Sequence, residues 1–225
     1  MTAAPVGTGP RPGFFLGVAG NIGAGKTELT LRLGEALGWP TQLEPVSKNP
    51  YLDAFYENMP RWSFHLQVSF LGERFLAQVA AETSGQPFIQ DRTLGEDAEV
   101  FARTLHEQGS MSEVDFGTYS MLYRALSVRA RKPELLIYLK AAPRTLEGRI
   151  ARRGRAAERH ITLDYLARLE HAYEAWIRRA RSEVEVIEID TDRVEIRGDT
   201  PAWRELVRDL QRRWPPQAEL ELGAG

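Results

Sequence analysis

The segment FFLGVAGNIGAGKT, residues 14 to 27, contains the residues whose chemistry is easiest to recognise. Gly20 and the run Gly25-Lys26-Thr27 satisfy the pattern G-x-x-x-x-G-K-[ST], between an apolar run and a stretch with helical period. Glycines let backbone N–H groups approach phosphate oxygens without a Cβ in the way, and the lysine neutralises the outer phosphates. The threonine hydroxyl is an oxygen ligand of the kind that Mg²⁺ prefers. The segment therefore predicts a nucleoside triphosphate site made of Gly20, Asn21, Ile22, Gly23, Ala24, Gly25, Lys26 and Thr27, with Thr27 at the metal.

Two acidic residues follow further apolar segments. Glu44 comes after a short run and precedes a proline, and Asp91 precedes Arg92. An acid at the end of a strand can hold Mg²⁺ or its waters beside a phosphate loop, and a neighbouring arginine can steady the reacting groups. A surface ion pair, worth ~0–1 kcal/mol, is the alternative for an isolated Asp-Arg step. Glu44 could face solvent, a structural arginine or a substrate.

An arginine-rich segment, RIARRGRAAERH, brings four guanidinium groups into seven residues. The group consists of Arg149, Arg152, Arg153 and Arg155, with Gly154 as a flexible point. A solvated helix face is one interpretation, because arginine is a good helix former. We favour a lid that closes over the triphosphate, because like charges at this density repel unless an anion binds between them.

A third segment, FYENMPRWSFHLQVSFLGERF, mixes aromatic residues with Gln67 and Arg74. These two residues are seven apart and share one helix face. A glutamine amide offers both a donor and an acceptor, which suits the edge of a nucleobase. Most of the aromatic residues in this segment are expected in the core.

Strands that alternate with helices must position these residues. Strand character is found in residues 14–18, 42–46, 87–90, 134–140 and 184–189. Helical period is found in residues 26–37, 61–82, 94–106, 113–131, 144–152, 163–181 and 202–213. This order predicts an α/β fold with a five-stranded parallel sheet flanked by helices. Ligands bind beyond the carboxyl ends of the strands in such sheets, where Glu44 and Asp91 are expected.

Composition narrows the class of protein. The chain has 225 residues, a formal net charge of −2 and no cysteine. The charge argues against a general nucleic-acid or membrane-surface partner, and thiolate metal sites are excluded. No apolar run reaches the ~20 residues of a membrane helix, and the four histidines lack metal-ligand spacing. We expect a cytoplasmic protein with one domain over residues 14–214 and flexible tails at 1–13 and 215–225.

Five stretches together resemble the deoxyribonucleoside kinases, and among them the bacterial deoxyadenosine/deoxyguanosine kinases. They are GNIGAGKT, EPVSKNPYLDAFY, RWSFHLQ with Arg74, DRTLGED, and RIARRGR with Glu158. Their order and spacing are more specific than the phosphate loop alone. The resemblance implies a P-loop kinase fold with an arginine-rich lid, ATP as phosphate donor, Mg²⁺, a small nucleoside as substrate and a homodimer.

The resemblance also implies a role for each matching residue. Glu44 is expected as the general base for the sugar 5′-hydroxyl, Arg92 as its neighbour, and Asp91 as the acid associated with Mg²⁺. Tyr56 and Glu158 match the pair that holds the 3′-hydroxyl. The residues expected to read the base are Gln67, Arg74 and Asp97. Those expected to engage the donor are the lid residues Arg149, Arg153 and Arg155, and Asp192 and Arg193 near the donor adenine, with Lys26 and Arg153 assisting the transfer.

The chain departs from the family pattern at three places. Asn49-Pro50 stands where many animal members have a tryptophan shortly after Glu-Pro-Val, and it matches the bacterial purine branch. Phe70 occupies the position between Gln67 and Arg74 that tunes base choice, so it is included among the substrate-binding residues. Asp91 replaces a glutamate, which favours a metal held partly through water.

The leading hypothesis is ATP-dependent 5′-phosphorylation of deoxyadenosine or deoxyguanosine for nucleotide salvage. A nucleoside monophosphate kinase is an alternative, and so is a regulatory module that binds ATP without turnover. Within the family, a pyrimidine-specific kinase stays open until a substrate panel is measured. An acceptor phosphate ~4 Å from Glu44 would cost about 4 kcal/mol at an effective dielectric near 20, unless arginines compensated. The EPVSKNPYLDAFY segment contains no arginine. The preference between adenine and guanine, the preferred triphosphate, the oligomeric state and feedback inhibition stay open at this point.

Overall fold

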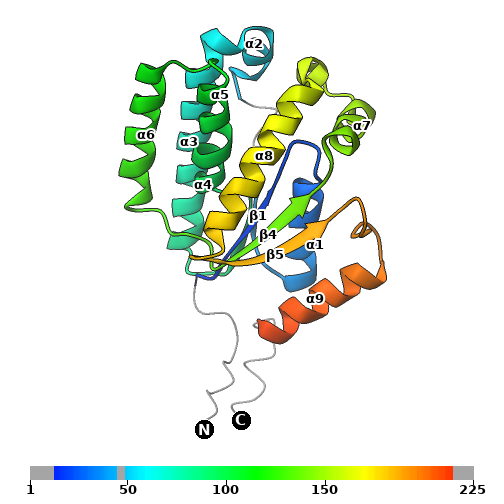
Figure 1. Cartoon of the computed structure of the whole chain (residues 1–225). Coiled ribbons are helices and arrows are strands. Elements are labelled where there is room, and N and C mark those ends of the chain that lie inside the picture. The colour runs from blue at the N-terminus through cyan, green and yellow to red at the C-terminus, as the bar shows by residue number, and fades with distance from the viewer. Residues whose placement is uncertain (1–12, 45–48, 215–225) are drawn as a thin grey trace, which may run out of the picture.

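The computed structural model describes residues 13–44 and 49–214. A five-stranded parallel sheet runs through the centre (Figure 1). Its strand order is β2-β3-β1-β4-β5. Its strands are β1 (Phe15–Gly20), β2 (Thr41–Gln42), β3 (Phe88–Asp91), β4 (Leu135–Lys140) and β5 (Glu185–Asp190). The predicted α/β architecture is confirmed.

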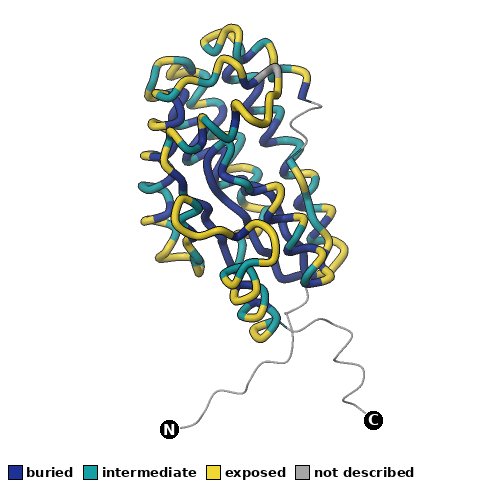
Figure 2. The backbone as a smooth tube through the Cα atoms, turned by 90° about the vertical axis from the view of Figure 1, so that its right-hand side faces the viewer, coloured by how far each residue is buried: buried dark blue, intermediate teal, exposed yellow. Residues whose placement is uncertain are grey.

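Helices cover both faces of the sheet. One side carries α1 (Lys26–Leu37) and α9 (Pro201–Arg213), and the other carries α3 (Met59–Thr83), α5 (Arg103–Glu107), α6 (Glu113–Ser127) and α8 (Leu163–Ala180) (Figure 1). Strands β1 and β3 are fully buried, and β4 is buried up to its last residue, Lys140, whereas β2 and the polar edge strand β5 are more exposed. Alternate residues of a strand face opposite sides of the sheet. Strand residues therefore contribute to two apolar clusters, one packed against α1 and α9 and the other against α3, α6 and α8. Figure 2 shows buried backbone through the middle of the molecule, with exposed residues at the periphery.

The shortest strand differs from its prediction. β2 contains only Thr41 and Gln42, and Leu43 and Glu44 have already left the sheet. Residues 45 and 46, also predicted as strand, lie outside the described residues, as do 1–12 and 215–225 of the expected tails. β2 lies at the edge of the sheet and pairs only with β3. This short strand leaves Glu44 free to turn toward other elements.

Helical regions also differ from the prediction. Residues 52–57 form a short helix, α2 (Leu52–Glu57), which the sequence did not predict because six residues are too few to show a period. The predicted helix over 94–106 is divided into α4 (Leu94–Glu96), a π-helix, η2 (Asp97–Ala102), and α5. π-helical turns widen the spacing of side chains and are frequently found at functional sites.

Two helices complete the edge of the sheet where the strands end. α7 (Pro143–Arg153) follows β4 and ends at Gly154, whose φ of 69° permits the left-handed C-cap. A 3₁₀ turn, η3 (Ala156–His160), connects it to α8 and packs against α2. Helix α6 ends at Ser127, four residues earlier than the predicted boundary. Together α2, α7 and η3 form the rim above the carboxyl ends of the strands.

Candidate active site

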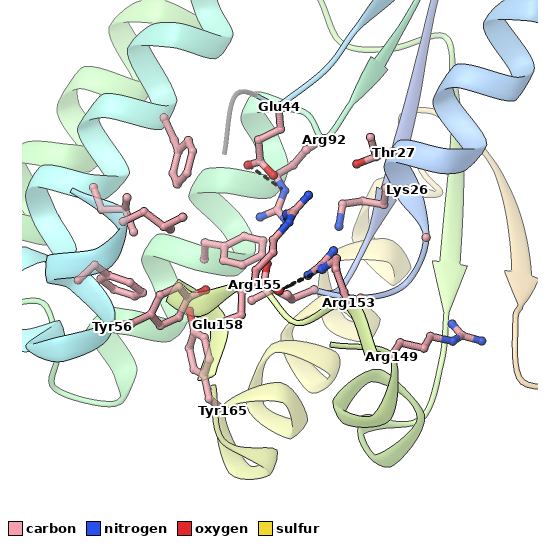
Figure 3. A pocket seen from close by; sticks show the side chains of 18 of the residues that line it. Lys26, Thr27, Glu44, Tyr56, Arg92, Arg149, Arg153, Arg155, Glu158 and Tyr165 are labelled. Carbon is pink, nitrogen blue, oxygen red and sulfur yellow. Dashed lines mark hydrogen bonds and ion pairs between the residues drawn. The ribbon is translucent and has the colours of Figure 1, made fainter. Parts of the chain in front are cut away.

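A cavity of about 420 Å³ lies beyond the carboxyl ends of β1 and β3 (Figure 3). The phosphate loop and α1 line one side of it, α2 and α3 line another, and α7 and η3 close it from above. It contains Glu44, Arg92 and Lys26, which come from three separate segments of the chain. The predicted convergence at this edge of the sheet is therefore observed.

The phosphate loop has the backbone that its glycines predict. Gly20 adopts a φ of 148°, and a Cβ on it would lie 2.6 Å from the carbonyl oxygen of Leu139. Gly25, at the N-cap of α1, has a φ of 101°. Lys26 is buried, and its Nζ donates to the carbonyl oxygens of Gly20 at 2.7 Å and Asn21 at 3.0 Å. Burial, together with the nearby Arg92, lowers the pKa of Lys26 to about 8.

Glu44 faces two arginines. Its Oε1 accepts a hydrogen bond from Arg74 Nη2 at 2.8 Å and lies 3.4 Å from Arg92 Nε. Burial alone would raise the pKa of Glu44, but the guanidinium groups of Arg92 and Arg74 outweigh it and hold the pKa below its usual value. Glu44 is therefore ionised at neutral pH and lines the cavity with its carboxylate.

Arg92 is held in an unusual backbone conformation. Its φ of 73° is the only positive value among the described non-glycine residues. Its carbonyl oxygen accepts hydrogen bonds from Gln90 Nε2 at 3.0 Å and Arg74 Nη1 at 3.3 Å, and its guanidinium lies 4.0 Å from the centre of the Phe101 ring. Left-handed backbone in a bulky residue costs free energy and persists where surrounding contacts enforce it, most often at functional sites.

Arg74 and Asp97, both predicted to read the base, bind each other. Arg74 Nε donates to Asp97 Oδ2 at 2.6 Å, and both side chains are buried. Arg74 Nη1 also donates to the carbonyl oxygen of Asp91 at 2.9 Å. Gln67, two turns earlier on the same face of α3, is buried in the cavity wall, and its Oε1 has no hydrogen-bond partner. Gln67, Phe70 and Asp97 all line the cavity, whereas Arg74 stands behind it.

The lid residues meet at Glu158. Arg153 donates to Glu158 Oε2 from Nε at 3.0 Å and from Nη2 at 2.7 Å, and Arg155 Nη1 lies 3.4 Å from Oε1. Tyr56, from α2, extends toward the same place (Figure 3). Burial, with Tyr165 and Glu158 nearby, raises the pKa of Tyr56, so its hydroxyl stays protonated.

The three predicted lid arginines do not share one environment. Arg149 lines the cavity but donates to the hydroxyl and carbonyl oxygens of Thr191 after β5, both at 2.9 Å. Asp192 and Arg193 line no part of the cavity: Asp192 Oδ2 accepts from the backbone of Ala142, and Arg193 pairs with Asp190. Their neighbour Arg197 lines the cavity and lies beside Gly25. A role for Asp192 and Arg193 stays a prediction.

Thr27 and Asp91 offer oxygen atoms to a metal ion. Thr27 Oγ1 donates to Asp91 Oδ2 at 2.5 Å, and Asp91 Oδ1 is buried without a hydrogen-bond partner. Among the described residues, no cluster of three or more acidic, histidine or cysteine side chains could hold a metal. An ion here would complete its coordination with water and phosphate oxygens, which is the usual way that proteins hold Mg²⁺. The residues therefore fit Mg²⁺.

Several site residues escaped the sequence analysis. Tyr165 and Phe101 line the cavity, and Arg197 borders the phosphate loop. Glu96 is fully buried beside Arg92. Tyr165 lies in the first turn of α8, within the helix predicted over residues 163–181, and that position could have pointed to it. The others carry no local signal, because their roles depend on contacts between distant segments.

A sequence model of the family described as deoxynucleoside kinase matches residues 16–212. Over 162 residues the chain is 42% identical to the deoxyadenosine/deoxycytidine kinase of Bacillus subtilis (strain 168), which covers 71% of this chain and 75% of that protein. Over 181 residues it is 34% identical to the deoxyguanosine kinase of the same organism, which covers 79% of this chain and 86% of that protein.

A solved structure has the same architecture. The deoxyadenosine kinase from M. mycoides with bound dATP superposes with a TM-score of 0.75 at 26% identity, covering 87% of this chain and 97% of that chain. The predicted kinase fold is confirmed by this similarity and by the parallel sheet. No helix in the described part of the chain is long and apolar enough to cross a membrane.

Proposed function

This chain belongs to the deoxynucleoside kinase family, and from that premise we propose that it transfers the γ-phosphoryl group of ATP to the 5′-hydroxyl of a purine deoxyribonucleoside. The product is the 5′-monophosphate, formed for nucleotide salvage. The observation that carries the proposal is the ionised Glu44 in a cavity shared with the phosphate loop. A carboxylate there can accept the proton of a neutral hydroxyl as the phosphoryl group arrives.

The acceptor nucleoside occupies the α2–α3 side of the cavity in this proposal. Glu44 and Arg92 face its 5′-oxygen, and Tyr56 with Glu158 binds its 3′-hydroxyl. Glu158 accepts a hydrogen bond from Arg153, one of the arginines proposed to bind the donor. The same residue therefore contacts both the sugar of the acceptor and the group that binds the donor. A lid that connects both substrates in this way assembles the site only when both are present.

The base lies against Gln67 and between the rings of Phe70 and Phe101. The unpartnered Gln67 Oε1 accepts from an exocyclic amine, and the amide N–H donates to a ring nitrogen. Adenine presents this pair of groups, and so does cytosine. A purine fills more of the apolar space than a pyrimidine, which is the reason that we place deoxyadenosine first.

The donor triphosphate lies on the phosphate loop. Lys26 exchanges its two backbone carbonyls for phosphate oxygens, and the lid arginines Arg149, Arg153 and Arg155 neutralise the transferring group. Mg²⁺ at Thr27 and Asp91 supplies charge neutralisation to the phosphates when it is bound. The buried and unpartnered Asp91 Oδ1 supports this position for the metal.

The charge argument against a monophosphate acceptor is weaker than the sequence suggested. Arg74 and Arg92, from outside the Glu44 segment, lie against Glu44 and compensate its charge. The case for a nucleoside acceptor therefore depends on the family and on the cavity itself. A nucleoside monophosphate kinase would need further cations free to bind the acceptor phosphate, but Arg74 is already engaged by Glu44 and Asp97.

A substrate panel tests the proposal. MgATP would be supplied with deoxyadenosine, deoxyguanosine, deoxycytidine, thymidine, adenosine and the matching monophosphates in one assay. We expect a purine deoxynucleoside to be phosphorylated fastest. Fastest turnover of deoxycytidine would retain the reaction and reject the purine preference. Phosphorylation of monophosphates alone, or ATP binding without turnover, would reject the proposed acceptor.

A homodimer is the assembly that we propose for the enzyme. Val114 and Met121 on α6 and Val128 at its C-cap are spaced seven apart and are more than half exposed, as is Leu76 on the adjacent α3. Apolar side chains in such a stripe indicate a partner helix, and a second copy offers the same self-complementary stripe. Light scattering should give twice the chain mass, and Met121→Glu should reduce it to the monomer mass. A monomer at micromolar concentration would reject the dimer.

A further inference from the structure

Glu96 is the most deeply buried acid beside the cavity. It is the last residue of α4, the short helix that follows the Arg92 loop, and its exposed fraction is 0%. Within α4 it completes a capping box with Thr93, because Thr93 Oγ1 accepts from Glu96 N at 3.3 Å and Glu96 Oε2 accepts from Thr93 N at 3.4 Å. A capping box fixes the helix start but requires no burial.

Its second oxygen reaches beyond α4. Glu96 Oε1 accepts a short hydrogen bond from the hydroxyl of Tyr173 on α8 and a longer one, 3.4 Å, from the backbone N–H of Gly20. Gly20 opens the phosphate loop, so one carboxylate joins this loop, the Arg92 loop and α8. Tyr173 is itself fixed by stacking on Tyr138, at 5.8 Å between ring centres.

Arg92 lies between two carboxylates. Its Nε is 3.4 Å from Glu44 Oε1 and 3.8 Å from Glu96 Oε1, and it makes no hydrogen bond of good geometry to either. The Phe101 ring supports the guanidinium from one face. The position of Arg92 is therefore decided by the balance of charge between Glu44, which lines the cavity, and Glu96, which does not.

We propose that Glu96 is a positioning residue for phosphoryl transfer: its ionised carboxylate shares Arg92 with Glu44 and anchors Gly20. This inference rests on the proposed function. An ionised Glu96 draws part of the guanidinium charge away from Glu44, which leaves Glu44 a stronger base. A neutral side chain at the same position leaves Arg92 to pair with Glu44 alone.

The ionisation of Glu96 depends on groups from every element around it. Burial raises the pKa of Glu96 to about 7, and Asp97 on η2 acts in the same direction. Arg92, Lys26 on α1 and the Tyr173 hydroxyl oppose this rise. Glu96 therefore changes charge near neutral pH, while Glu44 remains ionised because the arginines hold its pKa low.

Glu96→Gln tests the charge without removing the shape. Glutamine occurs at this position of capping boxes, and its single amide oxygen can still accept from Tyr173 and Gly20, while the weak 3.4 Å bond from Thr93 N is lost. We expect kcat with the best deoxynucleoside to fall about 10- to 100-fold, with little change in KM, because the reacting groups are misplaced and not lost. Glu99→Gln, three residues along the chain in a surface pair with Arg103, is the matched control and should retain wild-type kcat.

The pH profile separates positioning from a merely structural role. Wild-type kcat should rise with pH through a group near 7, and Glu96→Gln should remain at the low acid-side rate across pH 6–8. Tyr173→Phe removes a hydrogen bond that lowers the pKa of Glu96, so it should move the rise to higher pH. Circular dichroism and a Tm above the assay temperature would establish that each variant is folded.

The outcomes distinguish the role of Glu96 from the proposed kinase activity. A folded Glu96→Gln enzyme with kcat within twofold of wild type across this pH range would overturn the role of Glu96 and leave the kinase proposal intact. A wild-type enzyme that phosphorylates no deoxynucleoside would overturn both.

Discussion

Arg74 is bonded directly to Glu44, with Nη2 donating to Oε1 at 2.8 Å. The family resemblance implied different roles for the two residues, with Arg74 at the nucleobase and Glu44 at the sugar hydroxyl. In the structure Arg74 also donates to Asp97 and to the carbonyl oxygen of Arg92. The buried guanidinium of Arg74 thus fixes the position of Glu44, which is the proposed general base. It also fixes Asp97 in the nucleobase pocket and the strained backbone of Arg92.

Glu44→Gln should remove proton acceptance, together with the negative charge that Arg74 and Arg92 face. We expect kcat to fall by roughly 10²–10⁴, the usual contribution of a general base, while the affinity for ATP stays within a fewfold of wild type. Single-turnover kinetics and ATP titration would measure the two quantities. Glu57→Gln, on the exposed end of α2, is the control. An unchanged rate in folded Glu44→Gln would remove Glu44 from the mechanism.

Arg74→Met should destabilise the fold. It leaves Asp97 buried without its partner, and breaking one side of a buried ion pair costs about 3–5 kcal/mol of unfolding free energy. Urea denaturation would measure this loss. The double variant Arg74→Met/Asp97→Asn should recover part of it, because the uncompensated charge is gone. A double variant less stable than the single one would show that the Asp97 carboxylate is held by something other than Arg74.

Arg92→Lys should be slow although it keeps the charge. A lysine has no planar guanidinium to lie on Phe101 while facing Glu44, and we expect a loss of about 10² in kcat, comparable with removal of one preorganised donor. Steady-state kinetics with the preferred nucleoside would show it. Arg103→Lys, in a surface pair, controls for the exchange itself. A fully active Arg92→Lys enzyme would mean that charge alone suffices there.

The phosphate loop and the lid could be predicted because their signals are local. Glycines at the spacing of residues 20 and 25 are typical of the backbone conformation of a phosphate loop. Four arginines within seven residues repel one another unless an anion or solvent lies between them. The order of strands and helices likewise predicted the parallel sheet. The strand predicted over residues 42–46 differs from β2, because β3 pairs with Thr41 and Gln42 and a pairing limit of this kind leaves no mark in the local sequence.

The rest depends on contacts that no local pattern contains. Tyr173 meets Glu96 across 77 positions of the chain, and Arg74 meets Glu44 across 30. The π-helix that begins at Asp97 has a sequence that fits an ordinary helix equally well. Arg197, and not Arg193, borders the phosphate loop because the chain turns after β5, and that turn is decided by packing.

The lowered pKa of Lys26 predicts proton uptake when ATP binds. Burial and Arg92 lower its pKa to about 8, so part of the population is neutral at pH 8 before ATP binds. Triphosphate oxygens favour the charged form and raise the pKa, so ATP binding at pH 8 should take up protons, and at pH 6, where Lys26 is already charged, this uptake should vanish. Calorimetry in buffers of different ionisation enthalpy would measure the uptake. Lys26→Met should abolish it at pH 8, whereas the surface variant Lys132→Met should not. Equal proton uptake in wild type and Lys26→Met would assign the titration to another group.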